Sequence, residues 1–578
     1  MDAYTLAIVV SVLVYVAIGN YAGRKVKHLD DYFVAGRRAP TFMILGTLVA
    51  SVVGTNSFLG DVGMAYDGYV VVMIVTTAMT VSGYVLGALL FGRFIRRART
   101  STVAEFFGKR FNSRRVRAFA AMTVVIGVGG YLMTVTQGAA MVITWITDIT
   151  YIPALIAVWL GYTTFTIYSG SRGVVITDTL MFILFGTIGV MALSFIADSA
   201  GGWFESVRIL ADFEPRRGAL SASGFLGDGG LWNVPTDMWI WGAIIGSSWA
   251  VVVAISPWQS SRYLMARDEH VVIRSACIAV CVLSVLWSLI YVSGPVIAIL
   301  NPTIEPSNNA MIWAALNVMP TFFGALLLAG IVSAGLSSAS TFLTLVGFAI
   351  SNDVVDESTA TDEVRLRISR ITILVVGLVT LVLAMFVPPD IYWITNIVGP
   401  MFAAIWGPVA FMSVWSKRIT EAGAFWGMVA GFVGFVGPKA LTNLGVIALP
   451  TYMNPLLLGF VASLITVLVV SRQTQVSAEE AAYRDALHVA PPEMADEKAM
   501  RRTLMWPSIM MIWGAISSII LIVVYTRPYQ LAAGLIAADG PYVTWSGELI
   551  VALIFGATIS AAGFGARYIL TRIDSKTQ

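Results

Sequence analysis

Two short stretches of apolar sequence contain more small and polar residues than helix packing requires. The first, residues 50–61, reads Ala-Ser-Val-Val-Gly-Thr-Asn-Ser-Phe-Leu-Gly-Asp. In lipid, such a cluster either packs closely on a neighbouring helix or breaks to expose backbone groups to a ligand. Unwinding near Gly54 frees carbonyl oxygens for a cation and leaves the hydroxyls and the Asn56 amide to face a solute. We expect a broken helix here, with close packing as the alternative.

The second stretch, residues 330–341, reads Gly-Ile-Val-Ser-Ala-Gly-Leu-Ser-Ser-Ala-Ser-Thr and ends with four hydroxyls in five residues. Hard cations such as sodium prefer several oxygen ligands. Adjacent Ser hydroxyls and a carbonyl three or four residues earlier present such oxygens from one helical turn. The alternative is that the hydroxyls bond back to carbonyls of their own helix, which is common for single Ser and Thr residues.

Asp178 lies in an apolar stretch that begins near Gly173. A carboxylate inside a bilayer costs about 2.5–3.5 kcal/mol on insertion scales, so it needs a cation, a proton or a donor beside it. If the helix begins near Gly173, Asp178 lies only about 7 Å deep, and an interfacial carboxylate is the alternative. Asp61 is the other candidate carboxylate, at the outer end of the expected broken helix.

The composition places these segments in a membrane protein. Of 578 residues, 57% are hydrophobic and 12% are charged, against about 25% charged in soluble proteins. Apolar runs of 18 or more residues recur, each long enough to cross about 30 Å of hydrocarbon. The net charge of +3, without a continuous basic patch, argues against nucleic acid as a partner. The three His residues fall in expected loops, and no catalytic triad-like spacing recurs, so we expect no enzyme.

The hydropathy pattern predicts about fifteen transmembrane helices. They lie near residues 4–22, 40–66, 69–92, 117–147, 151–169, 174–198, 237–257, 271–300, 321–350, 367–388, 391–416, 421–441, 453–471, 506–526 and 547–570. All but five of the 36 Lys and Arg residues then fall in every second loop, with Arg262 among the loop residues. This bias predicts a multi-pass plasma-membrane protein with its N-terminus outside and its C-terminus in the cytoplasm.

Two loops are long enough to carry structure of their own. The external loop at about 199–236 has room for a short interfacial helix or a lid. The internal stretch 472–505 begins with a capping box, Ser477 with Glu480, and we expect one polar helix that stops before Pro491.

Four motifs resemble the sodium/solute symporter family, which includes bacterial sodium/proline, sodium/sialic acid, sodium/galactose and sodium/pantothenate transporters. They are Asp31-Tyr32-Phe33-Val34-Ala35-Gly36-Arg37-Arg38, the Thr177-Asp178 pair, Pro257-Trp258-Gln259 leading to Arg262-Tyr263, and the Ser-rich segment 333–341. The resemblance covers roughly residues 1–470. It implies an all-α membrane protein whose core, residues 40–420, is an inverted five-plus-five helix repeat of the leucine-transporter type. Residues 1–39 precede this core, and 421–471 (two helices), 472–505 (a cytoplasmic linker) and 506–578 (two helices and a tail) follow it.

The resemblance also implies the ligands of the co-transported sodium ion, which is not a tightly held cofactor. The main site would use carbonyls of Ala50, Val53 and Ala334 with hydroxyls of Ser337 and Ser338. A second site, present in only some members, would use Asp178, Ser338, Ser340 and Thr341. One or two sodium ions are therefore allowed.

The solute-facing positions are less constrained by the family pattern. Val52, Ser57 and Thr76 replace polar residues of some relatives, which argues against a sugar and favours an amino acid or a short carboxylate. The candidate solute ligands are Asn56, Ser57, Thr76, Gln137, Trp249 and Asn396. No buried Arg is expected at the site. We expect a sodium-coupled symporter in the lipid bilayer without an obligatory protein partner; the alternatives are a proton-coupled symporter that uses Asp178, or a transporter-like membrane sensor.

Overall fold

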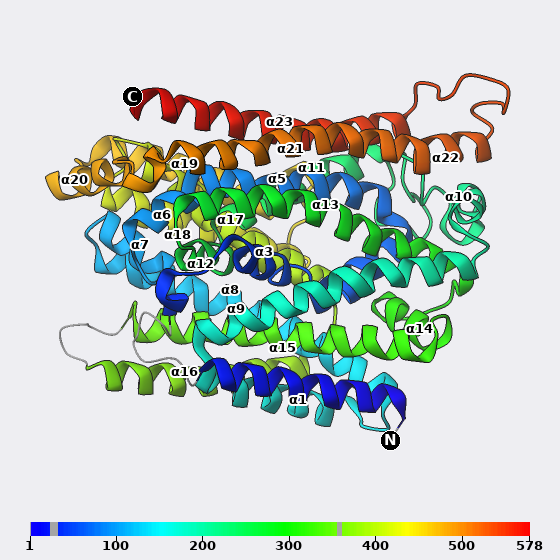
Figure 1. Ribbon diagram of the computed structural model, residues 1–578, viewed down its shortest axis with the longest axis horizontal. Coiled ribbons are helices and arrows are strands. Elements are labelled where there is room, and N and C mark those ends of the chain that lie inside the picture. Colours follow the sequence, from blue (N-terminus) through cyan, green and yellow to red (C-terminus); the bar gives the residue numbers. More distant parts are fainter. Residues whose placement is uncertain (1, 24–32, 355–360, 578) are drawn as a thin grey trace.

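The computed structural model describes residues 2–23, 33–354 and 361–577, and these residues form helices without a strand. Twelve of the described helices are long and apolar enough to cross a membrane, and Ala3–Ile18, Thr41–Ala50 and Tyr151–Thr164 are shorter apolar helices. The long helices run along the long axis of the molecule, and the two termini lie at opposite ends of that axis (Figure 1). An odd number of membrane crossings would place the two termini at opposite ends in this way. The twelve long and three shorter apolar helices are compatible with the expected count of about fifteen crossings.

The α-helices of the described residues are α1 (Ala3–Gly23), α3 (Thr41–Ala50), α4 (Val62–Met64), α5 (Val70–Gly87), α6 (Arg93–Ala98), α7 (Val103–Arg110), α8 (Arg114–Ile146), α9 (Tyr151–Ser199), α10 (Trp203–Ala211), α11 (Pro235–Ile255), α12 (Pro257–Met265), α13 (Glu269–Leu300), α14 (Ala310–Asn317), α15 (Thr321–Ser351), α16 (Asp362–Phe386), α17 (Ile391–Trp415), α18 (Glu421–Asn443), α19 (Pro455–Gln473), α20 (Ala478–Leu487), α21 (Glu497–Leu521), α22 (Arg527–Ala532) and α23 (Gly547–Thr577). Wider π-helical turns occur at Ser57–Asp61, Ala65–Tyr69, Ala88–Gly92 and Ile522–Thr526, and 3-10 turns occur at Ala35–Arg37, Glu214–Arg216, Ser307–Asn309, Thr451–Met453 and Pro492–Ala495.

The expected helix at 40–66 is broken where its small and polar residues indicate. α3 ends at Ala50, residues 51–54 form a turn and a bend, and helical conformation resumes at Thr55. Gly68, with a φ of 106°, separates this second half from α5. Only glycine adopts so large a positive φ without strain. Gly68 therefore sets the boundary between the second and third expected crossings.

The expected helices at 151–169 and 174–198 belong to one continuous helical element, α9. Its 49 residues do not run straight: a Cβ on Gly161 would stand 3.6 Å from Leu336, and Asp178, seventeen residues further on, accepts a hydrogen bond from Ser337, the residue next to Leu336. Its two apolar parts are Tyr151–Thr164 and Gly173–Ser199. α9 therefore accounts for both expected crossings, and the residues between them are helical as well.

Each of the two long loops expected from the sequence contains a short helix. The external loop contains α10, a short helix of the kind expected there. The internal stretch contains α20, which begins after a complete capping box between Ser477 and Glu480 and ends at Leu487, before Pro491. α21 begins at Glu497, so its first turns occupy residues expected in the linker. Residues 474–496, which connect α19 (Pro455–Gln473) to α21, form the linker of the structure.

Two arginines join the linker to the central helices. Arg97 on α6 forms an ion pair with Glu269 on α13, and its Nη1 donates to the Leu487 carbonyl at 2.7 Å. Arg110 on α7 donates from Nε to the Ser413 carbonyl at 2.6 Å and from Nη1 to the Glu480 carbonyl at 3.2 Å. The linker is thus hydrogen bonded to one end of the bundle.

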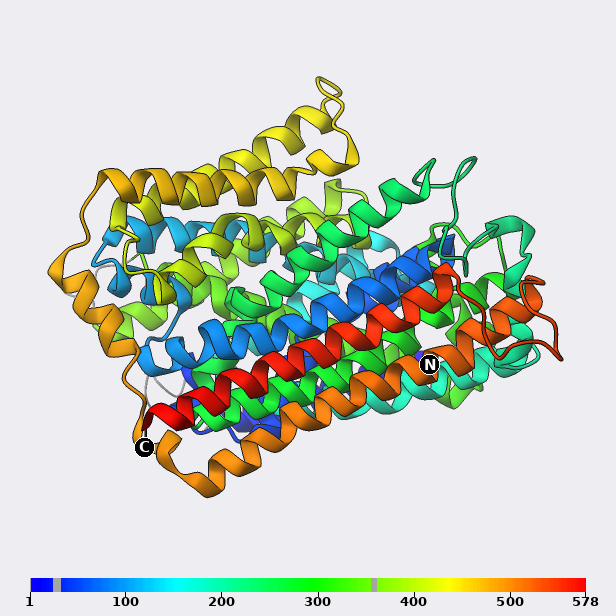
Figure 2. The same ribbon diagram turned by 90° about the horizontal axis from the view of Figure 1, so that it is seen from above.

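The helices that follow α17 lie on two separate faces. α18 and α19 pair with each other and with α17, whereas α21 and α23 pair with each other and lie against α13 and α5. Figure 2 shows these two pairs, in yellow and in orange and red, at opposite edges of the molecule. On a third side, α1 packs on α9 and α15 (Figure 1).

Helices α5 and α11 cross at a pair of glycines, and this contact gives a first testable prediction. A Cβ on Gly83 would stand 2.6 Å from the Ala250 Cα, and one on Gly87 would stand 2.5 Å from the Ala254 Cα. We expect Gly83→Val to force the two helices apart and to lower the apparent Tm in detergent by several degrees, as overpacking of about 1–3 kcal/mol does. Fluorescence-detected size exclusion after heating measures this loss.

Gly129→Ala is the matched control for this variant. No atom lies within 4 Å of a Cβ built on Gly129 in α8. Alanine at this open helical position should leave the Tm unchanged or raise it, because alanine has the better helix propensity. Equal losses of Tm in the two variants would contradict the close contact of α5 with α11.

Candidate cation and solute site

Asp178 lies where three helices meet. It is 2% exposed, so it lies in the interior of the protein and not on its surface. Thr47 on α3 donates to Asp178 Oδ2 at 2.5 Å, and Ser337 on α15 donates to Oδ1. Asp178 itself stands on α9, at a close contact where a Cβ on Gly46 would lie 2.8 Å from the Thr179 Cα. The carboxylate therefore ties the broken helix and the Ser-rich helix to α9.

Arg262 supplies the counter-charge to Asp178 but does not line the solute cavity described below, so it leaves open the expectation of a solute site without a buried Arg. Its side chain is 2% exposed, and its Nη2 donates to Asp178 Oδ2 at 3.2 Å and to Thr341 Oγ1 at 3.1 Å. The charge pattern assigned Arg262 to an internal loop. Instead, α11 ends before Pro257 and α12 continues inward from it, since proline favours the first position of a new helix.

The residues expected to bind the main sodium ion come together from two sides. Ala50 and Val53 flank the break, and their carbonyls accept no backbone hydrogen bond among the described residues. Across from them on α15 lie Ala334, Ser337 and Ser338, all buried. A Cβ on Gly54 would stand 3.4 Å from the Ser338 hydroxyl. The break at Gly54 therefore lies against the Ser-rich turn of α15.

Three of the four residues expected at a second sodium site, all but Ser338, are bonded to one another or to neighbours. Arg262 bridges Asp178 and Thr341. Ser340 donates to the Ser337 carbonyl at 2.8 Å and shares a hydrogen bond of 3.1 Å with the Tyr15 hydroxyl of α1. For Ser340 the bond back to its own helix, the alternative raised by the sequence, is therefore present. A guanidinium stands where the second cation was expected.

A cavity of about 70 Å³ lies beside the break, between its second half and helices α5, α8, α11, α13 and α17. Five of the predicted solute ligands line it: Asn56, Ser57, Thr76, Trp249 and Asn396. Trp249 Nε1 donates to Asn396 Oδ1 at 2.8 Å, which fixes both side chains. The residues after the break therefore reach a solute-sized space directly.

Gln137 does not line this cavity, and its prediction as a solute ligand is not supported. Its Nε2 donates to the Val387 carbonyl at 2.7 Å and to the Ala384 carbonyl at 3.4 Å. These carbonyls end α16, where the last turn lacks partners within the helix. Gln137 thus ties α8 to the end of α16.

Several residues that line the cavity were not predicted. They include the aromatic residues Tyr131, Trp287, Tyr291 and Tyr392, together with Thr395 and with Asp61, which the sequence suggested only as a candidate carboxylate. The sequence does contain a signal for Asp61, because this residue follows Ser57 by four positions and therefore lies on the same face of the helix. The aromatic residues come from helices distant in sequence, and nothing in their local pattern distinguishes them from core residues.

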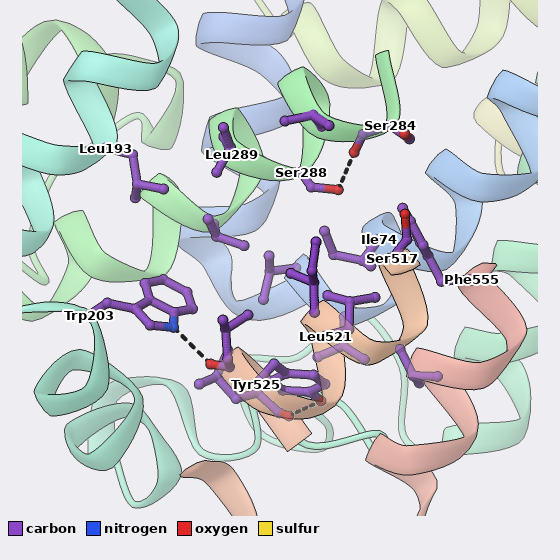
Figure 3. Close-up of a pocket in the computed structure, with 18 of the residues that line it drawn as sticks. Ile74, Leu193, Trp203, Ser284, Ser288, Leu289, Ser517, Leu521, Tyr525 and Phe555 are labelled. Carbon is purple, nitrogen blue, oxygen red and sulfur yellow. Dashed lines mark hydrogen bonds between the residues drawn. The ribbon is translucent and has the colours of Figure 1, made fainter. Parts of the chain in front are cut away.

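A larger cavity of 440 Å³ lies elsewhere, between α5, α13, α21 and α23 (Figure 3). Its walls are mainly apolar side chains such as Leu289, Leu521 and Phe555. Its serine hydroxyls donate within their own helices, as where Ser288 donates to the Ser284 carbonyl at 2.7 Å, and the Tyr525 hydroxyl donates to the Leu220 carbonyl. This cavity offers few polar groups to a cation or a polar solute, so we place the candidate site at the smaller one.

Comparison with known proteins assigns the family. The model of the "Sodium:solute symporter family" matches residues 32–431 of this chain. The chain belongs to the sodium:solute symporter family. Among curated relatives, the sodium/pantothenate symporter of Escherichia coli is 24% identical over 80% of this chain and 95% of its own length. The sodium/proline symporter of Salmonella typhimurium is 23% identical over 82% of this chain and 95% of its own length.

A solved symporter confirms the fold class. The substrate-bound outward-open structure of a Na⁺-coupled sialic acid symporter superposes with a TM-score of 0.70, at 15% identity, over 83% of this chain and 99% of that one. The symporter described here is thus an all-α, multi-pass membrane protein with the predicted leucine-transporter type of core. Family membership makes it a sodium-coupled importer of a solute, with sodium as the co-transported ion.

Proposed function

We propose that this symporter imports an amino acid or a short carboxylate, rather than a sugar, by alternating access. One observation carries the proposal: the break that presents the Ala50 and Val53 carbonyls continues directly into Asn56 and Ser57, which line the cavity. A cation bound at the break would fix the same segment that contacts the solute. Sodium and solute would therefore raise each other's affinity reciprocally.

The proposed sodium site consists of the Ala50, Val53 and Ala334 carbonyls with the Ser337 and Ser338 hydroxyls. We propose that one sodium ion is transported per cycle. The guanidinium of Arg262, 3.2 Å from Asp178, repels a second cation at that carboxylate in this arrangement. A single ion entering along a membrane potential supplies about 2.3 kcal/mol per 100 mV, enough to concentrate a neutral solute.

The proposed topology has the N-terminus outside and the C-terminus in the cytoplasm of a plasma-membrane protein. The alternating positions of Lys and Arg and the opposite placement of the termini (Figure 1) support it. The proposed division into residues 1–39, 40–420, 421–471, 472–505 and 506–578 keeps the transport core in the second unit. We propose transport without an enzymatic activity and without an obligatory protein partner.

Proton coupling through Asp178 is the second candidate. It would require that this carboxylate exchange a proton during the cycle. Arg262, Thr47 and Ser337 all donate to the Asp178 carboxylate, so a proton carrier at this position would have to exchange its proton against these contacts.

The test of the proposed function is uptake by proteoliposomes of pooled radiolabelled amino acids and short carboxylates. An inward sodium gradient should drive accumulation at least about ten-fold above an equal potassium gradient, since about 1.4 kcal/mol of driving force gives a factor of ten. External pH is held constant. Accumulation that follows an inward proton gradient and ignores sodium would reject sodium coupling in favour of the proton-coupled alternative.

A further inference from the structure

Asp61 is a carboxylate in the solute cavity without a cationic partner. It lies one helical turn beyond Ser57, within the apolar segment Ser57–Ala98. The Tyr291 hydroxyl donates to its Oδ2 at 3.0 Å, and no Lys or Arg of the described chain forms an ion pair with it. Asp178, a second buried carboxylate in an apolar membrane segment, has Arg262 beside it. An ionised carboxylate in a membrane segment needs such a partner.

Several hydrogen-bond donors around the cavity are committed to the protein. Trp249 donates to Asn396, Trp287 to Ser57, Tyr291 to Asp61, and both Thr76 and Thr77 to the Met73 carbonyl. In contrast, Asn56 Oδ1, an acceptor only, is buried without a hydrogen-bond partner among the described residues. The Thr395 hydroxyl is likewise buried without a partner there. The Asn56 carbonyl oxygen is therefore a buried acceptor to which a bound solute can donate.

Aromatic rings form much of the remaining wall. Trp287 and Tyr291 lie nearly parallel, with ring centroids 6.4 Å apart and an interplanar angle of 17°. Their polar atoms are held by Ser57 and Asp61, so both side chains are fixed in orientation. Tyr131, Trp249 and Tyr392 complete the aromatic lining. Aromatic faces attract cations, and they favour quaternary ammonium groups as well as protonated amines.

We propose that the transported solute carries a positively charged ammonium group, which binds between Asp61, the Asn56 carbonyl oxygen and the aromatic wall. This inference rests on the proposed sodium-coupled import and selects within its solute classes. It favours amino acids and betaines and rejects carboxylates without an amine, because these would place a second negative charge beside Asp61. The ammonium group supplies the counter-charge that the protein does not.

Pairs of compounds that differ only in this charge test the inference. Alanine and isobutyrate, proline and cyclopentanecarboxylate, and glycine betaine and 3,3-dimethylbutyrate have closely similar shapes, and only the first of each pair carries a cationic nitrogen. In proteoliposomes with an inward sodium gradient, we expect at least one ammonium compound to be taken up at least about ten-fold faster than its partner. For the two amino acids this factor corresponds to one charge-assisted hydrogen bond. Glycine betaine has no N–H, so its preference rests on its charge beside Asp61 and on the aromatic faces.

Asp61→Asn should remove this discrimination. The amide keeps the size of the carboxylate but cannot neutralise an ammonium group, so the ratio within the preferred pair should fall to near one. Asp67→Asn is the matched control: Asp67 lies on the same segment but does not line the cavity, and the ratio should stay as in the wild type. Stabilisation of the detergent-solubilised protein by sodium should persist in both variants.

The outcomes separate this inference from the proposed function. Sodium-dependent uptake confined to amine-free carboxylates, or a ratio unchanged by Asp61→Asn, would overturn the inference and leave sodium symport standing. If sodium stabilised the detergent-solubilised protein but no ammonium compound were taken up, the inference would likewise be overturned and sodium binding would stand. Uptake that ignores sodium, follows the proton gradient and loses its pH dependence in Asp61→Asn would overturn both, since Asp61 would then carry a proton.

Discussion

Replacing Ser337 by alanine is expected to abolish most sodium-dependent uptake while the protein still folds. A lost oxygen ligand to a charged species costs about 1.5–3 kcal/mol, or about ten- to a hundred-fold in sodium affinity. The sodium concentration that gives half-maximal uptake should rise by that factor. Ser337 also donates to Asp178, so its loss could act through the carboxylate as well. Ser338→Ala isolates the cation effect, because Ser338 faces Gly54 at the break.

Ser333→Ala is the matched control on the same helix. Ser333 is fully buried and donates to the Ser11 hydroxyl of α1 at 3.1 Å, four residues before Ser337. It should retain the sodium dependence of the wild type. If Ser337→Ala and Ser338→Ala both kept the wild-type half-maximal sodium concentration, the proposed cation site would be wrong.

Replacing Arg262 by methionine is expected to cause the largest loss of stability. The change leaves Asp178 buried and without its cation, and breaking a buried ion pair in this way costs about 3–5 kcal/mol. The thermal midpoint of the detergent-solubilised protein should fall steeply, and this fall is the quantity to measure. Asp178→Asn in the same chain should restore much of it, because the pair is then replaced by two uncharged groups.

An exposed ion pair provides the control for this cycle. Arg208 and Glu205 on α10 pair with each other, but their side chains are 66% and 40% exposed. Surface pairs contribute about 0–1 kcal/mol, so Arg208→Met should leave the thermal midpoint nearly unchanged. If the double variant Arg262→Met/Asp178→Asn were less stable than Arg262→Met alone, the stability lost in Arg262→Met would not come from the unpaired Asp178 carboxylate.

The sequence predicted the features that depend on local composition. Apolar length located the crossings, and the small and polar residues around Gly54 located the break. The same segment also supplied correct cavity residues, because Asn56 and Ser57 directly follow the break. These inferences succeed since a membrane leaves few alternatives: an apolar run must cross it, and an exposed backbone group must have a function or a partner.

The residues that sequence reasoning misplaced depend on contacts between distant segments. Arg262 looked like one more positive charge of an internal loop, and only the turn at Pro257 directs it inward to Asp178. Gln137 is a polar residue of α8, but its amide donates to carbonyls at the end of α16 and does not line the cavity. The aromatic wall of the cavity is assembled from α8, α11, α13 and α17, and no single segment contains a signal for it. Asp31 and Tyr32 of the first family motif lie outside the described residues.

The linker has a consequence for the kinetics of the transport cycle. Arg97 holds α6, α13 and the Leu487 carbonyl together, while Arg110 holds α7, the end of α17 and the Glu480 carbonyl. When these helix ends separate to release cargo, the linker must either travel with one group of helices or give up hydrogen bonds to the other. The lifetime of the open state at this end therefore depends on a segment that touches neither sodium nor solute.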